Sequence, residues 1–258
     1  MSANKNLVVY AFPHAGASAG IYRPFCQLHQ NSGTALLHPV EIPGRGVLGR
    51  EPEVTCLHTL AEKLADTLFS DFQQKQQQGI QCWATFGHSF GGVLSIAVTD
   101  VMHKKYGLKP VYSMVSGSVP PGEQGIDDLH LWSDESLLQK MREDQGTPNT
   151  VLNEPALARR YVAQLRSDFL VRSQFPSLRD LRVAQPLLLV AASDDPHVTE
   201  EQLQKWQQHT SDRTSMIRVD GDHFAVYRHW SVIQQAIDTE ASLRLAVENR
   251  MDSWSVFQ

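Results

Sequence analysis

A serine between two glycines is the residue whose type and spacing most directly suggest chemistry. The stretch Gly87-His88-Ser89-Phe90-Gly91 fits the pattern Gly-x-Ser-x-Gly. It lies between an expected strand at 82–86 and an expected helix that begins near Gly92. On such a sharp strand-to-helix turn the hydroxyl stands clear of the sheet, and the glycines let the backbone pass close by. Ser89 is therefore predicted to be a nucleophile.

A serine nucleophile needs a base, and the base needs an acid that orients it. Two adjacent acids, Asp194 and Asp195, follow one late expected strand, and His223 follows the next. The carboxyl ends of parallel strands gather a site at one edge of a sheet, so these loops should converge near Ser89. We predict a triad of Ser89, His223 and one of the two aspartates.

Acyl chemistry at Ser89 also requires two backbone N–H groups aimed at the developing negative charge. The first is predicted to be that of Phe90, which follows the nucleophile. The second should come from the loop at 13–18, after the first expected strand. Ala15 is the predicted donor there because a small residue lets the backbone approach the substrate. For His14, contact with substrate and packing beside the loop both remain open.

The elements that position these residues alternate between short apolar runs and helical patterns. Expected strands are 7–12, 35–42, 82–86, 111–115, 187–192 and 215–219, and expected helices are 55–72, 93–102, 202–208 and 226 onward. The run at 187–192 is apolar at every residue, as in a strand buried on both faces. Alternation of this kind predicts an α/β fold with a mostly parallel, doubly wound sheet.

One region interrupts the alternation. Between 119 and 185 no convincing strand is apparent, but helical patterns occur near 135–142 and from Pro155 onward. We expect a single domain over 1–258 with a helical insertion at about 119–185. Such an insertion is a candidate lid over the site. The alternative is a purely structural excursion.

Composition excludes several classes of protein. The 258 residues carry 23 Lys+Arg and 28 Asp+Glu, a net charge of −5 with both signs spread along the chain, which argues against nucleic-acid binding. The longest apolar runs have six residues, whereas a membrane-spanning helix needs about 20. The polar N-terminus lacks the apolar length of a secretory signal. Three widely spaced cysteines argue against disulfides and favour a cytoplasmic location.

Three weaker patterns point elsewhere. The stretch at 44–49 formally matches the dinucleotide fingerprint Gly-x-Gly-x-x-Gly, but Pro43 and Pro52 flank it, so no helix is expected to open there. The two adjacent aspartates could bind a metal, but no histidine-rich motif accompanies them. Cys82 is interpreted as an ordinary buried cysteine. We expect no cofactor and no metal.

Taken together, the motifs resemble those of the type II thioesterases, the stand-alone editing enzymes of polyketide and nonribosomal peptide synthetases, in the α/β-hydrolase superfamily. The matching stretches are FPHAGASA at 12–19, IPGRG at 42–46, GHSFGG at 87–92, SGS at 116–118, LRSDF at 165–169, DDP at 194–196, Trp206 and GDHF at 221–224. The resemblance runs from about residue 7 to 235. Ala17 and the pair 192–193 depart from the usual glycines, which leaves the shape of the oxyanion loop open.

The resemblance implies an α/β-hydrolase fold and a serine hydrolase that cleaves thioesters through an acyl-enzyme. It selects Asp195, the aspartate directly before proline, as the acid of the triad. It also implies the substrate, an aberrant or misprimed acyl group on the phosphopantetheine arm of an acyl or peptidyl carrier protein. We expect a monomer that binds neither nucleic acid nor membrane. Two rival interpretations are a generalist acyl-CoA thioesterase or carboxylesterase, and a non-catalytic binding protein.

Overall fold

Six parallel strands form the centre of the computed structural model, which describes residues 5–32, 34–125, 128–144, 146–147 and 149–255. They are β1 (Leu7–Phe12), β2 (Ala35–Pro39), β3 (Cys82–His88), β4 (Ser113–Ser116), β5 (Leu187–Ala192) and β6 (Thr214–Val219). Their order across the sheet is β2-β1-β3-β4-β5-β6, and every neighbouring pair is parallel. The predicted α/β fold with a parallel sheet is confirmed.

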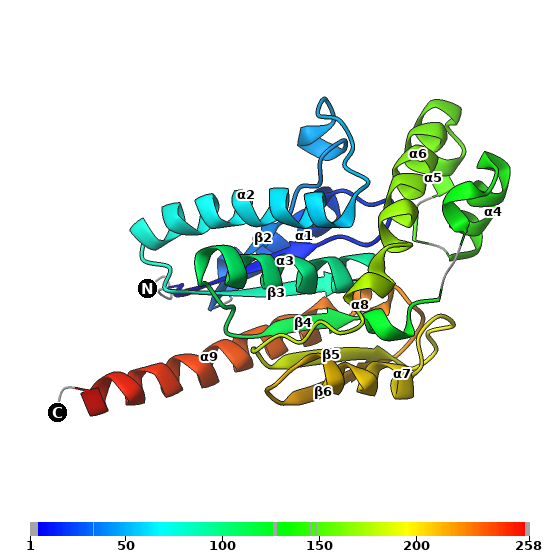
Figure 1. Cartoon of the computed structure of the whole chain (residues 1–258). Helices are drawn as coiled ribbons and strands as arrows, with labels where there is room; N and C mark the ends of the chain where they lie inside the picture. The colour runs from blue at the N-terminus through cyan, green and yellow to red at the C-terminus, as the bar shows by residue number, and fades with distance from the viewer. Residues whose placement is uncertain (1–4, 33, 126–127, 145, 148, 256–258) are drawn as a thin grey trace.

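Helices cover both faces of this sheet (Figure 1). One face carries α2 (Leu57–Gln77), α3 (Phe90–Tyr106), α7 (Glu200–Gln204) and the 3-10 helix η6 (Lys205–His209), and the other carries α1 (Arg23–Ser32), α8 (Ala225–Arg228) and α9 (Trp230–Ser255). Strand β1 shows the division, because its alternate residues point into different apolar clusters. Val8, Tyr10 and Phe12 pack with the first group of helices, and Leu7, Val9 and Ala11 with the second. The two faces are both buried, as a parallel sheet requires.

Element boundaries differ from the predictions at a few places. The strand expected at 35–42 ends at Pro39. Its partner β1 ends at Phe12, and the last hydrogen bond between the two segments runs from Val40 N–H to Ala11 O at 2.9 Å. Helix α1 was not predicted. It follows the 3-10 helix η1 (Ala19–Tyr22) and packs Phe25 and Cys26 against the apolar cluster on its face of the sheet.

A run of short helices connects β4 to β5, and we call residues 119–185 the cover segment. It contains η3 (Pro121–Glu123), η4 (Leu129–Leu131), α4 (Asp134–Asp144), α5 (Asn149–Leu152), α6 (Pro155–Arg172) and η5 (Phe175–Leu178). Residues 126–127, 145 and 148 of the expected insertion lie outside the described residues. In the rest of the segment, β pairing is limited to a bridge between Val183 and Thr210. Helices α4, α5 and α6 stand together beyond the carboxyl ends of the strands (Figure 1).

The expectation about a secretory signal falls partly on residues 1–4, which lie outside the described residues. Within the described ranges, no helix combines the length and the apolar character that crossing a membrane would take.

Candidate active site

Ser89 occupies the tight turn between β3 and α3. Its backbone has φ 54° and ψ −119°, a strained conformation that costs an ordinary residue about 1–3 kcal/mol. The turn is held by Ser89 N–H, which donates to Ser116 O at 2.8 Å. A Cβ on Gly87 would lie 2.2 Å from Gly91 O, and one on Gly91 would lie 2.4 Å from Phe12 O. Only glycine fits at these two positions, which explains why the motif brackets the serine with them.

The two acids that follow β5 have different surroundings. Asp195 Oδ2 lies 2.7 Å from His223 Nδ1, and Asp195 Oδ1 accepts the His197 N–H at 2.8 Å. The Asp195 side chain is 1% exposed and that of His223 is 9% exposed. Asp194 is exposed, and its carboxylate accepts the hydroxyl of the serine before it. The structure therefore brings His223 together with Asp195, the acid that the resemblance selects.

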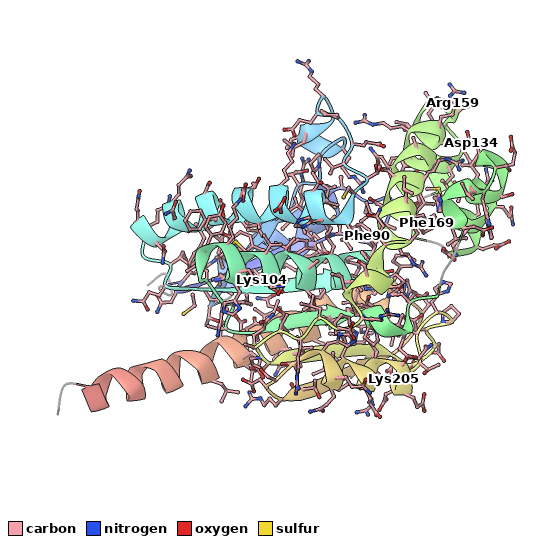
Figure 2. All side chains as sticks on the ribbon, viewed as in Figure 1. Phe90, Lys104, Asp134, Arg159, Phe169 and Lys205 are labelled. Carbon is pink, nitrogen blue, oxygen red and sulfur yellow. The ribbon has the colours of Figure 1, made fainter. Side chains whose placement is uncertain are left out.

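Ser89 and His223 line one cavity of about 260 Å³. Its lower wall comes from loops at the edge of the sheet and its upper wall from the cover segment. The lower wall includes His14, Ala15, Phe90, Gly117, Ser118 and Phe224, and the upper wall includes Val119, Leu129, Lys140, Asp144, Leu165, Phe169 and Arg172. Figure 2 shows Phe90, at the start of α3, close to Phe169 of α6, where the two walls meet.

The predicted oxyanion donors, Ala15 and Phe90, both lie at this cavity. Phe90 begins α3, and the first N–H groups of a helix have no partner within the helix. Ala15 lies in a turn after β1 that is closed by Ala17 N–H donating to His14 O at 3.1 Å. Both backbone segments therefore border the same space as the Ser89 side chain.

Two further histidines lie close to His223, and both are buried. His14 Nδ1 lies 2.8 Å from the Tyr227 hydroxyl, and burial, with the charges of His223 and Arg45, lowers the pKa of His14 to about 3. Burial also lowers the pKa of His88, whose ring centroid is 4.8 Å from that of His223. Both rings are neutral near pH 7, so neither places a second positive charge beside His223. His14 is packed beside the loop and also lines the cavity.

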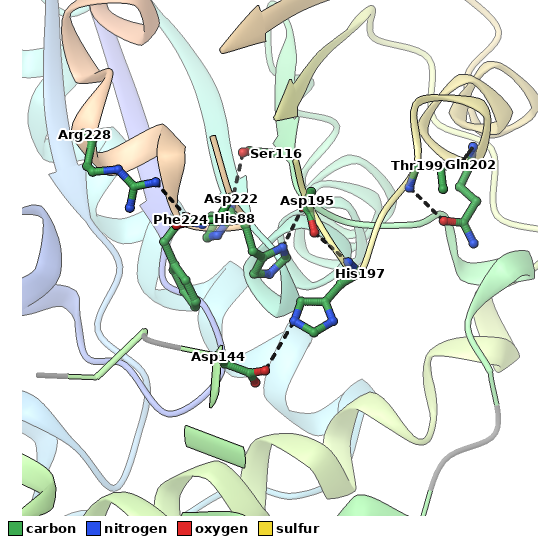
Figure 3. Close-up of polar contacts among 11 residues, drawn as sticks. His88, Ser116, Asp144, Asp195, His197, Thr199, Gln202, Asp222, Phe224 and Arg228 are labelled. Atoms are coloured by element: carbon green, nitrogen blue, oxygen red, sulfur yellow. Dashed lines mark hydrogen bonds and ion pairs between the residues drawn. The ribbon is translucent and has the colours of Figure 1, made fainter. Parts of the chain in front are cut away.

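A polar contact joins the cover segment to the loop that carries Asp195. His197 Nε2 lies 3.3 Å from Asp144 Oδ1 at the end of α4, and Lys140 Nζ lies 2.9 Å from Asp144 Oδ2. Figure 3 shows His197 between Asp144 and Asp195. The His197 ring also meets the His223 ring edge-on, with centroids 5.0 Å apart. Sequence reasoning missed His197 and Asp144, because they are distant in the chain and neither belongs to a local motif.

The three weaker sequence patterns have structural explanations. The stretch at 44–49 forms a turn and the 3-10 helix η2 (Gly46–Leu48), so it does not open an α-helix after a strand as the dinucleotide fingerprint requires. Asp195 pairs with His223, whereas Asp194 is exposed. Across the described part of the chain, His, Cys, Asp and Glu side chains form no group of three that could hold a metal ion. Cys82 is 8% exposed, which confirms that it is buried.

A serine on a strained turn, a paired histidine and aspartate, and a parallel sheet define an α/β-hydrolase-fold serine hydrolase. Residues 8–239 match the thioesterase domain family, and the chain belongs to that family. The motifs of the sequence indicate a resemblance to type II thioesterases, and this resemblance is confirmed.

Relatives in sequence and structure cover most of the chain. It is 29% identical to a protein named linear gramicidin dehydrogenase LgrE from Brevibacillus parabrevis, over 88% of this chain and 84% of that one. It is 27% identical to the thioesterase PikA5 from Streptomyces venezuelae, over 89% of this chain and 79% of that one. The structure of BorB, a type II thioesterase from the borrelidin biosynthetic cluster, matches with a TM-score of 0.78 at 25% identity, over 91% of this chain and 92% of that one.

Proposed function

We propose that this protein hydrolyses acyl thioesters on the phosphopantetheine arm of carrier proteins in polyketide or nonribosomal peptide biosynthesis. In this role it would release aberrant or misprimed acyl groups and regenerate the free thiol. The observation that carries the proposal is that the strained Ser89 lines one cavity with His223, whose ring pairs with the buried Asp195. Family membership and the similarity to the thioesterase PikA5 support thioester chemistry, and the similarity to BorB, from the borrelidin biosynthetic cluster, supports the biosynthetic setting.

The first half of the reaction acylates Ser89. Its Oγ attacks the thioester carbonyl carbon while His223 Nε2 takes the hydroxyl proton. Asp195 accepts the hydrogen bond from His223 Nδ1, which fixes the tautomer and stabilises the imidazolium. The N–H groups of Ala15 and Phe90 stabilise the oxyanion of the tetrahedral intermediate. The intermediate collapses, the carbon–sulfur bond breaks, and His223 returns the proton to the departing thiolate.

The second half releases the acid. Water attacks the acyl-Ser89 carbonyl and gives a proton to His223, and the same two N–H groups stabilise the second oxyanion. Collapse of this intermediate breaks the bond to Ser89 Oγ, which recovers its proton from His223. The products are a carboxylic acid and a free carrier thiol.

The cover segment gives the site its selectivity in this proposal. The acyl chain would lie between the two walls of the cavity, where Val119, Leu165 and Phe169 supply apolar contact. The cover segment would act as a lid whose short helices define the space for the chain. We do not propose the dehydrogenase activity that the name of LgrE indicates, because the 44–49 stretch of this chain lacks the strand-to-helix geometry of a dinucleotide site.

The test compares two donors of the same short acyl group, an acyl-carrier protein and the acyl-coenzyme A. We expect kcat/KM to be at least about tenfold higher for the carrier protein, equal to about 1.4 kcal/mol of transition-state stabilisation. The Ser89→Ala variant controls for background hydrolysis. Parity between the donors would favour the generalist hydrolase. Absence of turnover together with absence of fluorophosphonate labelling at Ser89 would favour a non-catalytic binding protein.

A further inference from the structure

A buried ion pair joins α6 of the cover segment to the segment after β2. Arg45 Nη1 lies 2.6 Å from Asp168 Oδ2, and Arg45 Nη2 lies 2.5 Å from Asp168 Oδ1. Each side chain is only 2% exposed. Two parallel charge-assisted hydrogen bonds of this kind fix the relative orientation of both groups. The proposed reaction steps use neither residue.

Both members of the pair also hold the loop that carries Ala15. Asp168 Oδ2 accepts the Gly16 N–H at 2.7 Å, and Arg45 Nη1 donates to Ala17 O at 3.1 Å. The loop is a β-turn closed by the contact from Ala17 N–H to His14 O, and Gly16 has φ 78° at its third position. A positive φ there is the mark of a type II turn. The pair therefore makes hydrogen bonds to this turn on both sides of the Gly16–Ala17 peptide.

We propose that Arg45 and Asp168 are positioning residues that hold the 14–17 turn so that the Ala15 N–H is aimed at the oxyanion. The inference rests on the proposed function. The two common turn types differ by a flip of the central peptide, here the one between Ala15 and Gly16. Asp168 binds the N–H of that peptide and so favours one of the two orientations. The Ala15 N–H belongs to the preceding peptide, so its direction depends on the placement of the whole turn, which Asp168 holds at Gly16 N–H and Arg45 holds at Ala17 O. Small displacements of a donor matter, because oxyanion stabilisation depends on a preset distance and direction.

The chemistry of the pair suits this role better than it suits stability alone. A buried ion pair is weak evidence for stability, since apolar residues of similar volume often serve as well. A carboxylate, however, can accept from Gly16 N–H and Arg45 at once. A lone aspartate would also place negative charge near the developing oxyanion, and Arg45 neutralises it. Burial lowers the pKa of Arg45, but the charge and hydrogen bonds of Asp168 outweigh burial and raise it, so Arg45 stays charged.

The same helix also borders the acyl cavity. Leu165 and Phe169 of α6 line the cavity, whereas Asp168 on that helix contacts the turn. A Cβ placed on Gly16 would lie 3.5 Å from Leu165 Cδ1. Helix α6 therefore packs against the turn through Leu165 as well as through the hydrogen bond of Asp168. Hydrogen bonding by Asp168 can therefore be changed separately from the apolar contact.

The test uses two double variants that both remove the charges. Arg45→Met with Asp168→Asn keeps an oxygen that can accept the Gly16 N–H, whereas Arg45→Met with Asp168→Leu has none. Neither leaves an unpaired buried charge, which is the main hazard of a single substitution. We expect kcat for thioester hydrolysis to be at least about tenfold lower in the leucine variant than in the asparagine variant, with KM values within about twofold.

A transition-state analogue separates positioning from a merely structural role. Ser89 Oγ adds to the carbonyl carbon of an acyl trifluoromethyl ketone, its proton passes to His223, and the resulting alkoxide occupies the oxyanion position. The inhibition constant should rise in the leucine variant by the same factor by which kcat falls, because both depend on the N–H donors. A structural role would instead change melting temperature and KM.

Each result supports or overturns the inference. Equal kcat and equal analogue affinity in the two folded double variants would overturn it, and so would a loss confined to KM. If the leucine variant does not fold, Arg45→Lys takes its place, since a lysine cannot reach both Asp168 oxygens and Ala17 O in the same way. A fall in kcat of about fivefold with a parallel loss of analogue affinity is expected, and no change would overturn the inference. A wild-type protein that neither hydrolyses thioesters nor binds the analogue would instead refute the proposed function.

Discussion

The edge of the sheet and the cover segment are built in different ways. Ser89 and Asp195 follow β3 and β5, which are almost entirely buried between the helices of the two faces. His223 follows β6, which pairs with β5 at the edge of the sheet and ends at the buried Val219. The cover segment has a separate small cluster, formed by Leu137, Met141, Leu152, Val162, Leu165 and Phe169. Rigid strands fix the reacting groups relative to one another, whereas a segment with a small core of its own opens locally at lower cost. In the proposed function, the edge of the sheet therefore carries the chemistry and the cover segment selects the acyl chain.

Helix α6 is the exception that makes this comparison informative. Its Leu165 and Phe169 belong to the cover cluster, but its Asp168 contacts Arg45 and Gly16. Changes at the sheet edge should therefore act on kcat, and changes in the cover cluster should act on acyl-chain preference. Changes at Asp168 should act on kcat although the residue lies in the cover segment.

The largest effect should follow from removing the nucleophile. Ser89→Ala is expected to lower kcat for thioester hydrolysis by about 10⁵-fold or more, with residual catalysis from the oxyanion donors alone. The melting temperature should stay near that of wild type, because the substitution removes only the hydroxyl group. Acyl-transfer assays on purified protein measure the loss. More than a trace of activity would show that Ser89 is not the nucleophile.

A somewhat smaller effect should separate the adjacent acids. Asp195→Asn is expected to lower kcat by about 10³–10⁴-fold, because His223 would lose the partner that holds its tautomer. Asp194→Asn is the matched control and should change kcat by less than about threefold, since its carboxylate is exposed and does not contact His223. Steady-state kinetics at saturating thioester distinguish them. Equal effects, or the reverse order, would show that the acid has been misassigned.

Sequence patterns were sufficient wherever neighbours in the chain determine the structure. The elbow at Ser89 could be predicted because its glycines, strand and helix are contiguous. The acids and His223 could be placed because consecutive parallel strands end at one edge of the sheet. Between the two acids, the residues alone gave no decision. The structure separates them by burial and by the 2.7 Å contact of Asp195 with His223.

Contacts between distant segments could not be predicted in the same way. Arg45 lies in the motif at 42–46 and Asp168 in the motif at 165–169, but no local pattern pairs them. One signal was available, because Asp168 lies between Leu165 and Phe169 on the apolar side of a helical pattern. A charged residue on such a face requires a partner or a hydrogen-bonding role when buried. The identity of that partner depends on how the cover segment folds back, which the sequence does not encode locally.

A moderate effect should follow from a substitution in the cover segment. Phe169 lines the cavity, whereas Leu137 lies in the same cover cluster but away from the cavity. Phe169→Leu should shift the ratio of kcat/KM between long and short acyl groups by about fivefold in favour of the longer chain, because a smaller side chain enlarges the site. Leu137→Met is the control, since it perturbs the same cluster with little change in volume. An equal shift in both variants would mean that the whole cover segment had rearranged.

The smallest effect should come from the contact between the two regions. Burial raises the pKa of Asp144, but hydrogen bonds with His197 and Lys140 outweigh burial and lower it. A lowered pKa means that the ionised Asp144 stabilises the folded protein, fully above the ordinary aspartate value of 3.8 and progressively less as the pH falls through the lowered pKa.

Asp144→Asn should therefore lower the melting temperature at pH 7 by about 1–3 °C, equal to less than about 1 kcal/mol for a partly exposed pair, and by a smaller amount near pH 3. Asp100→Asn is the matched control, because Asp100 also pairs with a lysine one helical turn away but lies on α3, outside the cover segment. Hydrogen exchange of the α4 amides should quicken in the Asp144 variant and stay unchanged in the control. If both variants leave α4 exchange at the wild-type rate, the Asp144–His197 contact does not hold the cover segment to the sheet edge. Of these two contacts, the pair of Arg45 and Asp168 would then be the one that holds the cover segment to the sheet edge.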